Sequence, residues 1–174
     1  MKHIKLLLVL SFLFLTTCKQ KENTVISEEK PTSTFYFIRH SEKDRSDSTN
    51  HNPHLNEQGL LRAEKWSHVF KNITFDAIYS TDYNRTRETA TPTAIKNNLD
   101  LIIYKPNMNE IAKFLKNNEG KNVLVVGHSN TTPNFVNKIL GSDTYKEIDD
   151  NNNKNLYIVT KKGNDISSSL LFIE

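Results

Sequence analysis

The sequence has a single cysteine, little net charge and no long apolar run, and each of these absences excludes a class of protein. With only Cys18, no disulfide can form within the chain. The formal net charge is +3, and Lys2 and Lys5 lie in the first 17 residues, so the remainder carries 21 of the 23 basic residues against 20 acidic ones. A nearly neutral chain lacks the clustered basic surface that nucleic-acid binding requires. The 174 residues contain no internal repeat and fit one globular domain.

The first residues have the form of an export signal. Two lysines and a histidine precede an apolar run over residues 6–15, which is shorter than the roughly 20 residues needed to span a bilayer. The run ends in Leu-Thr-Thr-Cys, which resembles a bacterial lipobox. We therefore predict a lipoprotein signal peptide over residues 1–17 and an acylated Cys18. The protein would then be extracytoplasmic, anchored to a bacterial membrane on its periplasmic or cell-surface side. A plain signal peptide with an incidental cysteine is the alternative.

A flexible tether is predicted between the lipid anchor and the folded domain. Residues 18–33 are polar, include Pro31 and have neither helical nor strand periodicity. The folded domain is predicted over residues 34–174.

Within the domain, apolar runs and helical spacing alternate. Strands are predicted at residues 34–38, 75–79, 101–104, 122–126, 156–160 and 170–173. Helices are predicted at residues 56–70, from residue 82 onward with a kink near Pro92, at 108–115, and from the first-turn Pro133 to Gly141. This alternation predicts a three-layer α/β/α sandwich with a mostly parallel central sheet. The polar stretch at residues 149–155 is predicted to be an exposed loop, without the spacing of a calcium-binding loop.

Two of the predicted strands end in a histidine. Arg39 and His40 close the first strand, and Gly127 and His128 close the fourth. In open parallel sheets, ligands bind beyond the carboxyl ends of the strands, so both histidines are candidates for one site. Arg85 lies in the first turn of a helix, where the backbone N–H groups and the helix dipole favour an anion. A guanidinium offers paired donors to phosphate oxygens. The structural alternatives are hydrogen-bonded histidines and a solvated arginine.

Four motifs occur in order at these predicted strand and helix ends. They read FIRHSEK (residues 37–43), LNEQGLLRA (55–63), YSTDYNRTRETA (79–90) and VVGHSN (125–130). Together they resemble the histidine phosphatase, or phosphoglycerate mutase-like, superfamily, in its small branch without a cap domain. The resemblance implies that His40 becomes phosphorylated while Arg39, Arg85 and His128 surround the phosphoryl oxygens. It also implies a metal-independent hydrolysis of phosphomonoesters, with no cofactor.

The chemistry can be derived from the side chains as well. A neutral imidazole nitrogen can attack phosphorus while its other nitrogen is held as a donor, giving a phosphohistidine that water then hydrolyses. Two arginines and a second histidine, expected to be protonated, would stabilise the charge on the phosphoryl oxygens without a metal ion.

The sequence departs from the family pattern in two places. Ser41 stands where a glycine usually follows the Arg-His pair, and we expect it to contact the substrate. The second departure concerns the general acid that protonates the leaving group. Glu110 is the candidate and Glu42 a competing choice, and the structural alternative for Glu110 is an exposed glutamate at a helix start.

Other functions fit the same residues less well. An esterase elbow around Ser129 fails, because Thr131 replaces the required glycine and no histidine follows. His51 and His54 lack a third metal ligand at a recognised spacing. A phosphate-binding lipoprotein without turnover and a protein phosphohistidine phosphatase remain alternatives to an enzyme for a small phosphorylated substrate. A mutase is not favoured, because the connections are short. Substrate identity and oligomeric state are not determined by the sequence.

Overall fold

The domain is built around a six-stranded sheet whose strand order is β3-β2-β4-β1-β5-β6. The computed structural model describes residues 29–174, so the predicted signal peptide, Cys18 and most of the predicted tether lie outside the described residues. The strands are β1 (Thr32–Arg39), β2 (Ala77–Ser80), β3 (Leu101–Ile103), β4 (Asn122–Gly127), β5 (Asn155–Lys162) and β6 (Asp165–Phe172). The first four are parallel, and β5 and β6 form an antiparallel pair beside β1.

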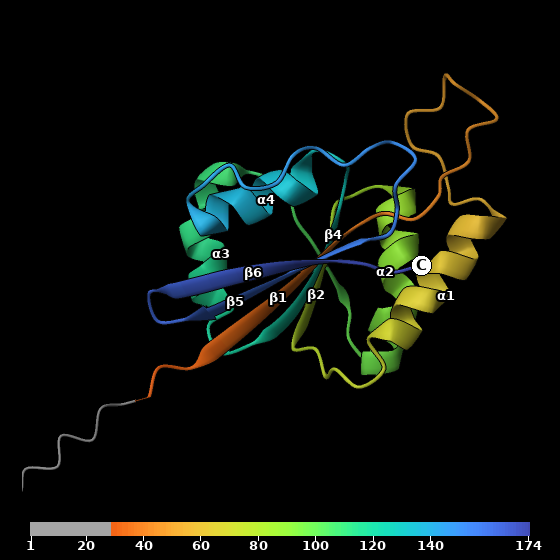
Figure 1. The fold of residues 1–174 in the computed structure, drawn as a ribbon. Helices are drawn as coiled ribbons and strands as arrows, with labels where there is room; N and C mark the ends of the chain where they lie inside the picture. The colour runs from red at the N-terminus through yellow and green to blue at the C-terminus, as the bar shows by residue number, and fades with distance from the viewer. Residues whose placement is uncertain (1–28) are drawn as a thin grey trace, which may run out of the picture.

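Four α-helices and one 3₁₀ turn complete the domain. They are α1 (Glu57–Val69), α2 (Asn84–Asn97), the turn η1 (Met108–Glu110), α3 (Ile111–Asn117) and α4 (Thr131–Leu140). Figure 1 shows α1 and α2 on one side of the sheet and α3 and α4 on the other. The predicted α/β/α sandwich with a mostly parallel sheet is therefore confirmed. Within residues 29–174, no helix has the length and apolar character needed to cross a bilayer.

Each face of the sheet has its own apolar core, because successive side chains of a strand point to opposite faces. Trp66 of α1, Phe70 at the C-cap of that helix and Ala90 of α2 pack with Ile38 and its sheet neighbours on one face. On the other face, side chains of α4 pack with the alternate residues of β1, β4 and β5. Fully burying a large apolar side chain stabilises a domain by about 1.5–3 kcal/mol, so the two cores fix both helical layers.

The helix predictions hold in their main features. Asn56 caps α1 by accepting a hydrogen bond from the Gly59 N–H at 2.8 Å. Pro133 is the third residue of α4, which ends at Gly141 with a φ of 70°. Two apolar residues of α1, Leu60 and Leu61, lie outside the core and are 52% and 68% exposed.

Some boundaries also differ. Strand β1 begins at Thr32, two residues before the predicted start of the domain, and α2 continues through Pro92 to Asn97. Strand β6 begins at Asp165, although only its last part was predicted. Its first part has three consecutive serines, Ser167, Ser168 and Ser169, rather than an apolar run, and full-length pairing with β5 extends the strand.

The loop after β1 is fixed against α1 by residues of the second motif. The Arg62 Nε donates to both carboxylate oxygens of Glu42, at 2.7 and 2.9 Å, and the Asn56 N–H donates to the Glu42 carbonyl at 3.0 Å. A Cβ atom at Gly59 would lie 2.1 Å from the same carbonyl oxygen. Glycine is therefore required here by the close approach of two backbones. The contact holds the loop that follows His40.

We predict that Gly59→Ala lowers the free energy of unfolding by about 1–3 kcal/mol, because the added methyl must displace the loop backbone. In an uncrowded helix the same change would stabilise the protein by up to about 1 kcal/mol, so the sign of the effect is informative. Urea unfolding monitored by circular dichroism measures it. Gln58→Ala, at the exposed neighbouring position, is the control. A Gly59→Ala protein as stable as wild type would contradict the prediction.

Candidate active site

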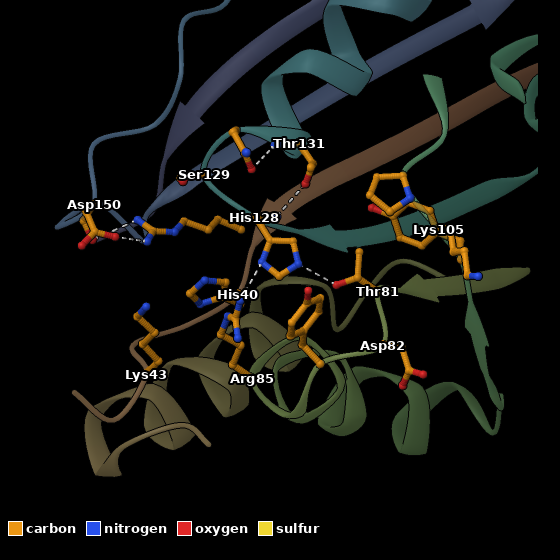
Figure 2. A pocket seen from close by; sticks show the side chains of 15 residues that line it. His40, Lys43, Thr81, Asp82, Arg85, Lys105, His128, Ser129, Thr131 and Asp150 are labelled. Carbon is orange, nitrogen blue, oxygen red and sulfur yellow. Dashed lines mark hydrogen bonds and ion pairs between the residues drawn. The ribbon is translucent and has the colours of Figure 1, made fainter. Parts of the chain in front are cut away.

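A cavity of about 750 Å³ lies at the edge of the sheet where β1, β2 and β4 end. Figure 2 shows the side chains that line it. Four of the predicted site residues line the cavity: Arg39, His40, Arg85 and His128. The parallel strands and the N-terminus of α2 bring these residues together from three distant parts of the chain, as expected for the carboxyl edge of a parallel sheet.

His40 is held as a neutral imidazole with a defined tautomer. Its side chain is buried, and the Nδ1 donates to the Ser41 carbonyl at 2.7 Å, which leaves Nε2 with a free lone pair. Burial lowers the pKa of His40 to about 3, and the nearby charges of Arg39, Arg85 and His128 add to this effect, against the opposing Ser41 hydrogen bond. At neutral pH the Nε2 atom is therefore an available nucleophile.

His128 faces His40, with the two ring centroids 5.5 Å apart. Its Nε2 lies 2.9 Å from the Oγ1 of Thr81, and the Thr81 hydroxyl donates to the Oγ1 of Thr86 at 3.0 Å. The Thr86 hydroxyl in turn donates to the carbonyl oxygens of Thr81 and Tyr83, both at 2.9 Å. Because this chain ends on carbonyls, each hydroxyl is committed as a donor away from His128. The His128 Nε2 must then donate to Thr81, and Nδ1 is the nitrogen that faces Arg85, 3.4 Å from its NH2.

The protonation of His128 differs from the prediction. Burial lowers the pKa of His128 to about 4, and the charges of Arg85, Arg39 and Lys43 add to this effect. With no anion bound, the ring is therefore neutral at pH 7. An anion between the two histidines would oppose these cations and raise the pKa of His128. The protonated state expected from the sequence therefore requires a bound anion.

Arg85 is the second residue of α2 and is positioned by its neighbours. The Tyr83 ring lies under the guanidinium, 4.5 Å from ring centroid to Cζ, and also contacts His128 edge-on. The Asn52 Oδ1 accepts from the Asn84 N–H at 2.9 Å, so part of the polar loop after β1 packs against the start of α2. The Nε of Arg85 is buried and has no partner among the described residues.

The segment at residues 149–155 is part of the site, so the prediction of a simple exposed loop is wrong. The NH1 of Arg39 donates to the carbonyls of Asp149, Asp150 and Asn152 at 2.9, 3.0 and 3.1 Å, and its NH2 donates to the Asp150 Oδ1 at 2.7 Å. Asn153 is buried, and its Nδ2 donates to the His40 carbonyl at 2.7 Å. Residues beyond the fourth parallel strand therefore hold both members of the Arg-His pair.

Ser41 and both candidate general acids lie outside the group that surrounds the histidines. Ser41 is fully buried behind the cavity, where its N–H donates to the Thr89 Oγ1 at 2.9 Å. Glu110 lines a separate cavity of about 130 Å³, which adjoins the first through Tyr104 and Lys105. Glu42 is engaged by Arg62. The structure therefore does not support Ser41 as a substrate contact, or Glu110 or Glu42 as the general acid.

Lys43, Thr81 and Asp150 are among the cavity residues that sequence reasoning missed. Lys43 and Thr81 lie within the quoted motifs, whereas Asp150 had no signal beyond the polar composition of its loop. His54 forms an ion pair with Glu88. Residues 29–174 hold no group of three or more His, Cys, Asp or Glu side chains placed to bind a metal ion.

Comparison with known proteins identifies relatives of the fold. The family model described as the histidine phosphatase superfamily (branch 1) matches residues 35–113, which include Arg39, His40 and Arg85 but not His128. No curated protein matches the sequence.

Solved structures share the fold at low sequence identity. A mycobacterial glucosyl-3-phosphoglycerate phosphatase is 11% identical with a TM-score of 0.66, over 82% of this chain and 98% of that one. The protein histidine phosphatase SixA, solved with tungstate, is 14% identical with a TM-score of 0.65, over 80% and 96%. The phosphoglycerate mutase of Bacillus anthracis is 17% identical with a TM-score of 0.63, over 82% and 94%. At such identities the likeness establishes the fold alone.

We predict that Thr81→Val changes the tautomer of His128. Valine keeps the shape of threonine but cannot accept from Nε2, so the imidazole loses the bond that selects its protonated nitrogen. Long-range ¹H–¹⁵N NMR at pH 7 should report a protonated Nε2 in wild type and a mixture of tautomers in the variant. Thr91→Val, at an exposed position of α2, is the control. A wild-type His128 protonated on Nδ1 would contradict the assignment.

Proposed function

Because the chain belongs to the histidine phosphatase superfamily, we propose that it hydrolyses phosphomonoesters through a phosphohistidine on His40, without a metal ion. The observation that carries the proposal is the state of His40, a buried neutral imidazole whose Nδ1 is held by a backbone carbonyl. His40 lines the same cavity as Arg39, Arg85 and His128, and the His128 ring lies 5.5 Å away between centroids. Such an arrangement suits a nucleophile for a phosphoryl group.

In the first step, the Nε2 lone pair of His40 forms a bond to phosphorus and the bond from phosphorus to the ester oxygen breaks. The leaving group departs with that electron pair and takes a proton from solvent. In the second step, water attacks phosphorus and the P–N bond breaks. The imidazole is regenerated and inorganic phosphate is released. Charge on the equatorial oxygens would be met by Arg85 and Arg39 and by His128, which the dianion favours in its protonated form.

The two acidic residues that line the cavity, Asp82 and Asp150, are not suited to protonate the leaving group. The carboxylate of Asp82 pairs with Arg87, and that of Asp150 pairs with Arg39 and Arg45. Hydrogen bonds from Arg45 and then from Arg39 lower the pKa of Asp150 to about 2, so it is not a proton donor near neutral pH. General acid catalysis contributes on the order of 10²–10⁴ in rate. Substrates whose leaving groups need little protonation, such as aryl phosphates, are therefore favoured over alkyl phosphates.

A protein phosphohistidine is the second candidate substrate, and the same observation favours it. An imidazole is a better leaving group than an alkoxide, and the solved structure of SixA, a protein histidine phosphatase, has the same fold. Against it stands the predicted export of this chain. A small phosphorylated compound outside the cytoplasm therefore remains the proposed substrate.

The location is proposed from the sequence. We infer that residues 1–17 direct export and that acylated Cys18 anchors the domain to a bacterial membrane, on its periplasmic or cell-surface side. A chain of roughly 13 residues then separates the anchor from the start of β1, long enough to act as a tether.

We predict that residues 19–174 hydrolyse 4-nitrophenyl phosphate in the presence of EDTA, and that His40→Ala abolishes this activity. The loss should reach at least about 10³-fold, because the covalent route needs the imidazole. His68→Ala is the matched control, since His68 is exposed on α1 and distant from the cavity. An alkyl phosphate should react on the order of 10² times more slowly than the aryl ester. Full activity of His40→Ala, or loss of wild-type activity in EDTA, would rule out the mechanism.

We also predict that Cys18→Ala releases the protein from the membrane. In a bacterial host fed a radiolabelled or alkyne-tagged fatty acid, the wild-type chain should carry the label and sediment with membranes. The variant should carry no label, because its acyl acceptor is missing. Ser27→Ala, in the predicted tether, is the control. An unlabelled wild-type protein would favour the plain signal peptide instead.

A further inference from the structure

The bonding of Arg39 leaves a gap in the charge of the proposed phosphoryl pocket. Both terminal nitrogens of its guanidinium already bond the loop at residues 149–152, and the Asp150 carboxylate compensates its charge at 2.7 Å. Only the buried Nε has no partner among the described residues. A free guanidinium can offer two parallel donors to a phosphoryl group. Arg39 can offer only its Nε while its terminal nitrogens keep their hydrogen bonds to the loop.

Lys43 lies where a further cation is needed. It lines the main cavity together with His40 and Arg85, and it also lines a second opening of about 290 Å³ beside His40 and Asp150. In Figure 2 it stands on the side of His40 that also holds Asp150. Its charge contributes to the lowered pKa of His128, which places Lys43 in the same electrostatic field as the two histidines.

The Lys43 ammonium has no partner among residues 29–174. No hydrogen bond or ion pair of its side chain with a described residue is found, although the residue is partly buried. Burial lowers its pKa, and the charges of Arg45, Arg85 and Arg39 add to this effect, whereas Asp150 opposes it. A partly buried cation among other cations is unfavourable unless an anion joins it. Asp150, the carboxylate that opposes this shift, is already bound by two arginines.

We propose that Lys43 is a phosphoryl-binding residue of this site. It supplies positive charge to the ligand, because the charge of Arg39 is already compensated by the loop at residues 149–152. The inference rests on the proposed function, because it assumes that the cavity binds a phosphoryl group. Arg39 then orders the loop and offers only its Nε to the oxygens, while Arg85, Lys43 and a protonated His128 supply the other contacts. The ligand is a phosphoryl dianion, and the leaving group need not carry a charge of its own.

The experiment measures binding of inorganic phosphate by titration calorimetry at pH 7, which requires no turnover. Lys43→Met should weaken phosphate binding by roughly 10- to 100-fold, the range typical of a hydrogen bond to a charged group. Lys43→Arg should restore binding to within about threefold, because it keeps the charge. Arg45→Met is the matched control: Arg45 is a nearby cation that does not line the main cavity. It should change binding by less than about threefold. Unfolding midpoints of all variants verify that they are folded.

The outcomes separate this inference from the proposed function. If Lys43→Met binds phosphate as wild type does, or if Arg45→Met loses as much affinity as Lys43→Met, Lys43 is only part of a general positive field and the proposal fails. A wild-type protein that binds no phosphate overturns both. If wild type binds phosphate with the expected dependence on Lys43 but does not hydrolyse an aryl phosphate, the proposed function fails and the assignment of Lys43 stands.

Discussion

The guanidinium of Arg39 is the interaction on which the site depends. It projects from the end of the central strand β1 and binds three backbone carbonyls and one carboxylate of a loop more than 100 residues later in the chain. The same loop places Asn153 on the carbonyl of His40. Arg39 is only 3% exposed, so its charge requires this set of acceptors, and the loop in turn takes its conformation from the arginine. The antiparallel extension of the sheet is thereby tied to the nucleophile.

A second constraint is the accumulation of positive charge around two uncharged rings. Burial lowers the pKa of both histidines, and the charges of Arg85, Arg39 and Lys43 lower the pKa of His128 further. The protein thus keeps His40 deprotonated, as the proposed nucleophile requires, and leaves His128 able to accept a proton when an anion binds. Hydrogen bonds that the rings donate to the Ser41 carbonyl and the Thr81 hydroxyl fix which nitrogen of each ring faces the cavity. Fixed donors of this kind stabilise transferred charge without reorganisation during the reaction.

The two sides of the cavity differ in how they are built. Close contact between Gly59 and Glu42, together with the Arg62 ion pair, fixes the loop after His40 against α1. On the opposite side the cavity reaches Tyr104 and Lys105 and adjoins a smaller, largely aromatic cavity. In the proposed function, the phosphoryl end of a substrate would lie among residues at or next to the ends of β1, β4 and α2, whereas its leaving group would meet loops.

The sequence by itself determined the sandwich, the order of its elements and four residues of the cavity. Periodicity reports which side chains are buried, and the carboxyl edge of a parallel sheet brings strand ends together whatever their separation in the chain. Only the tertiary structure decided what lies beside those residues. Glu110 was a reasonable acid by its place in the chain, but the turn before α3 directs it to a neighbouring cavity. From the sequence, Asp150 and Asn153 were only polar residues of a predicted exposed loop. No local sequence pattern shows that this loop contacts a buried arginine of the first strand. Side-chain partners and tautomers depend on three-dimensional proximity, which a linear pattern does not encode.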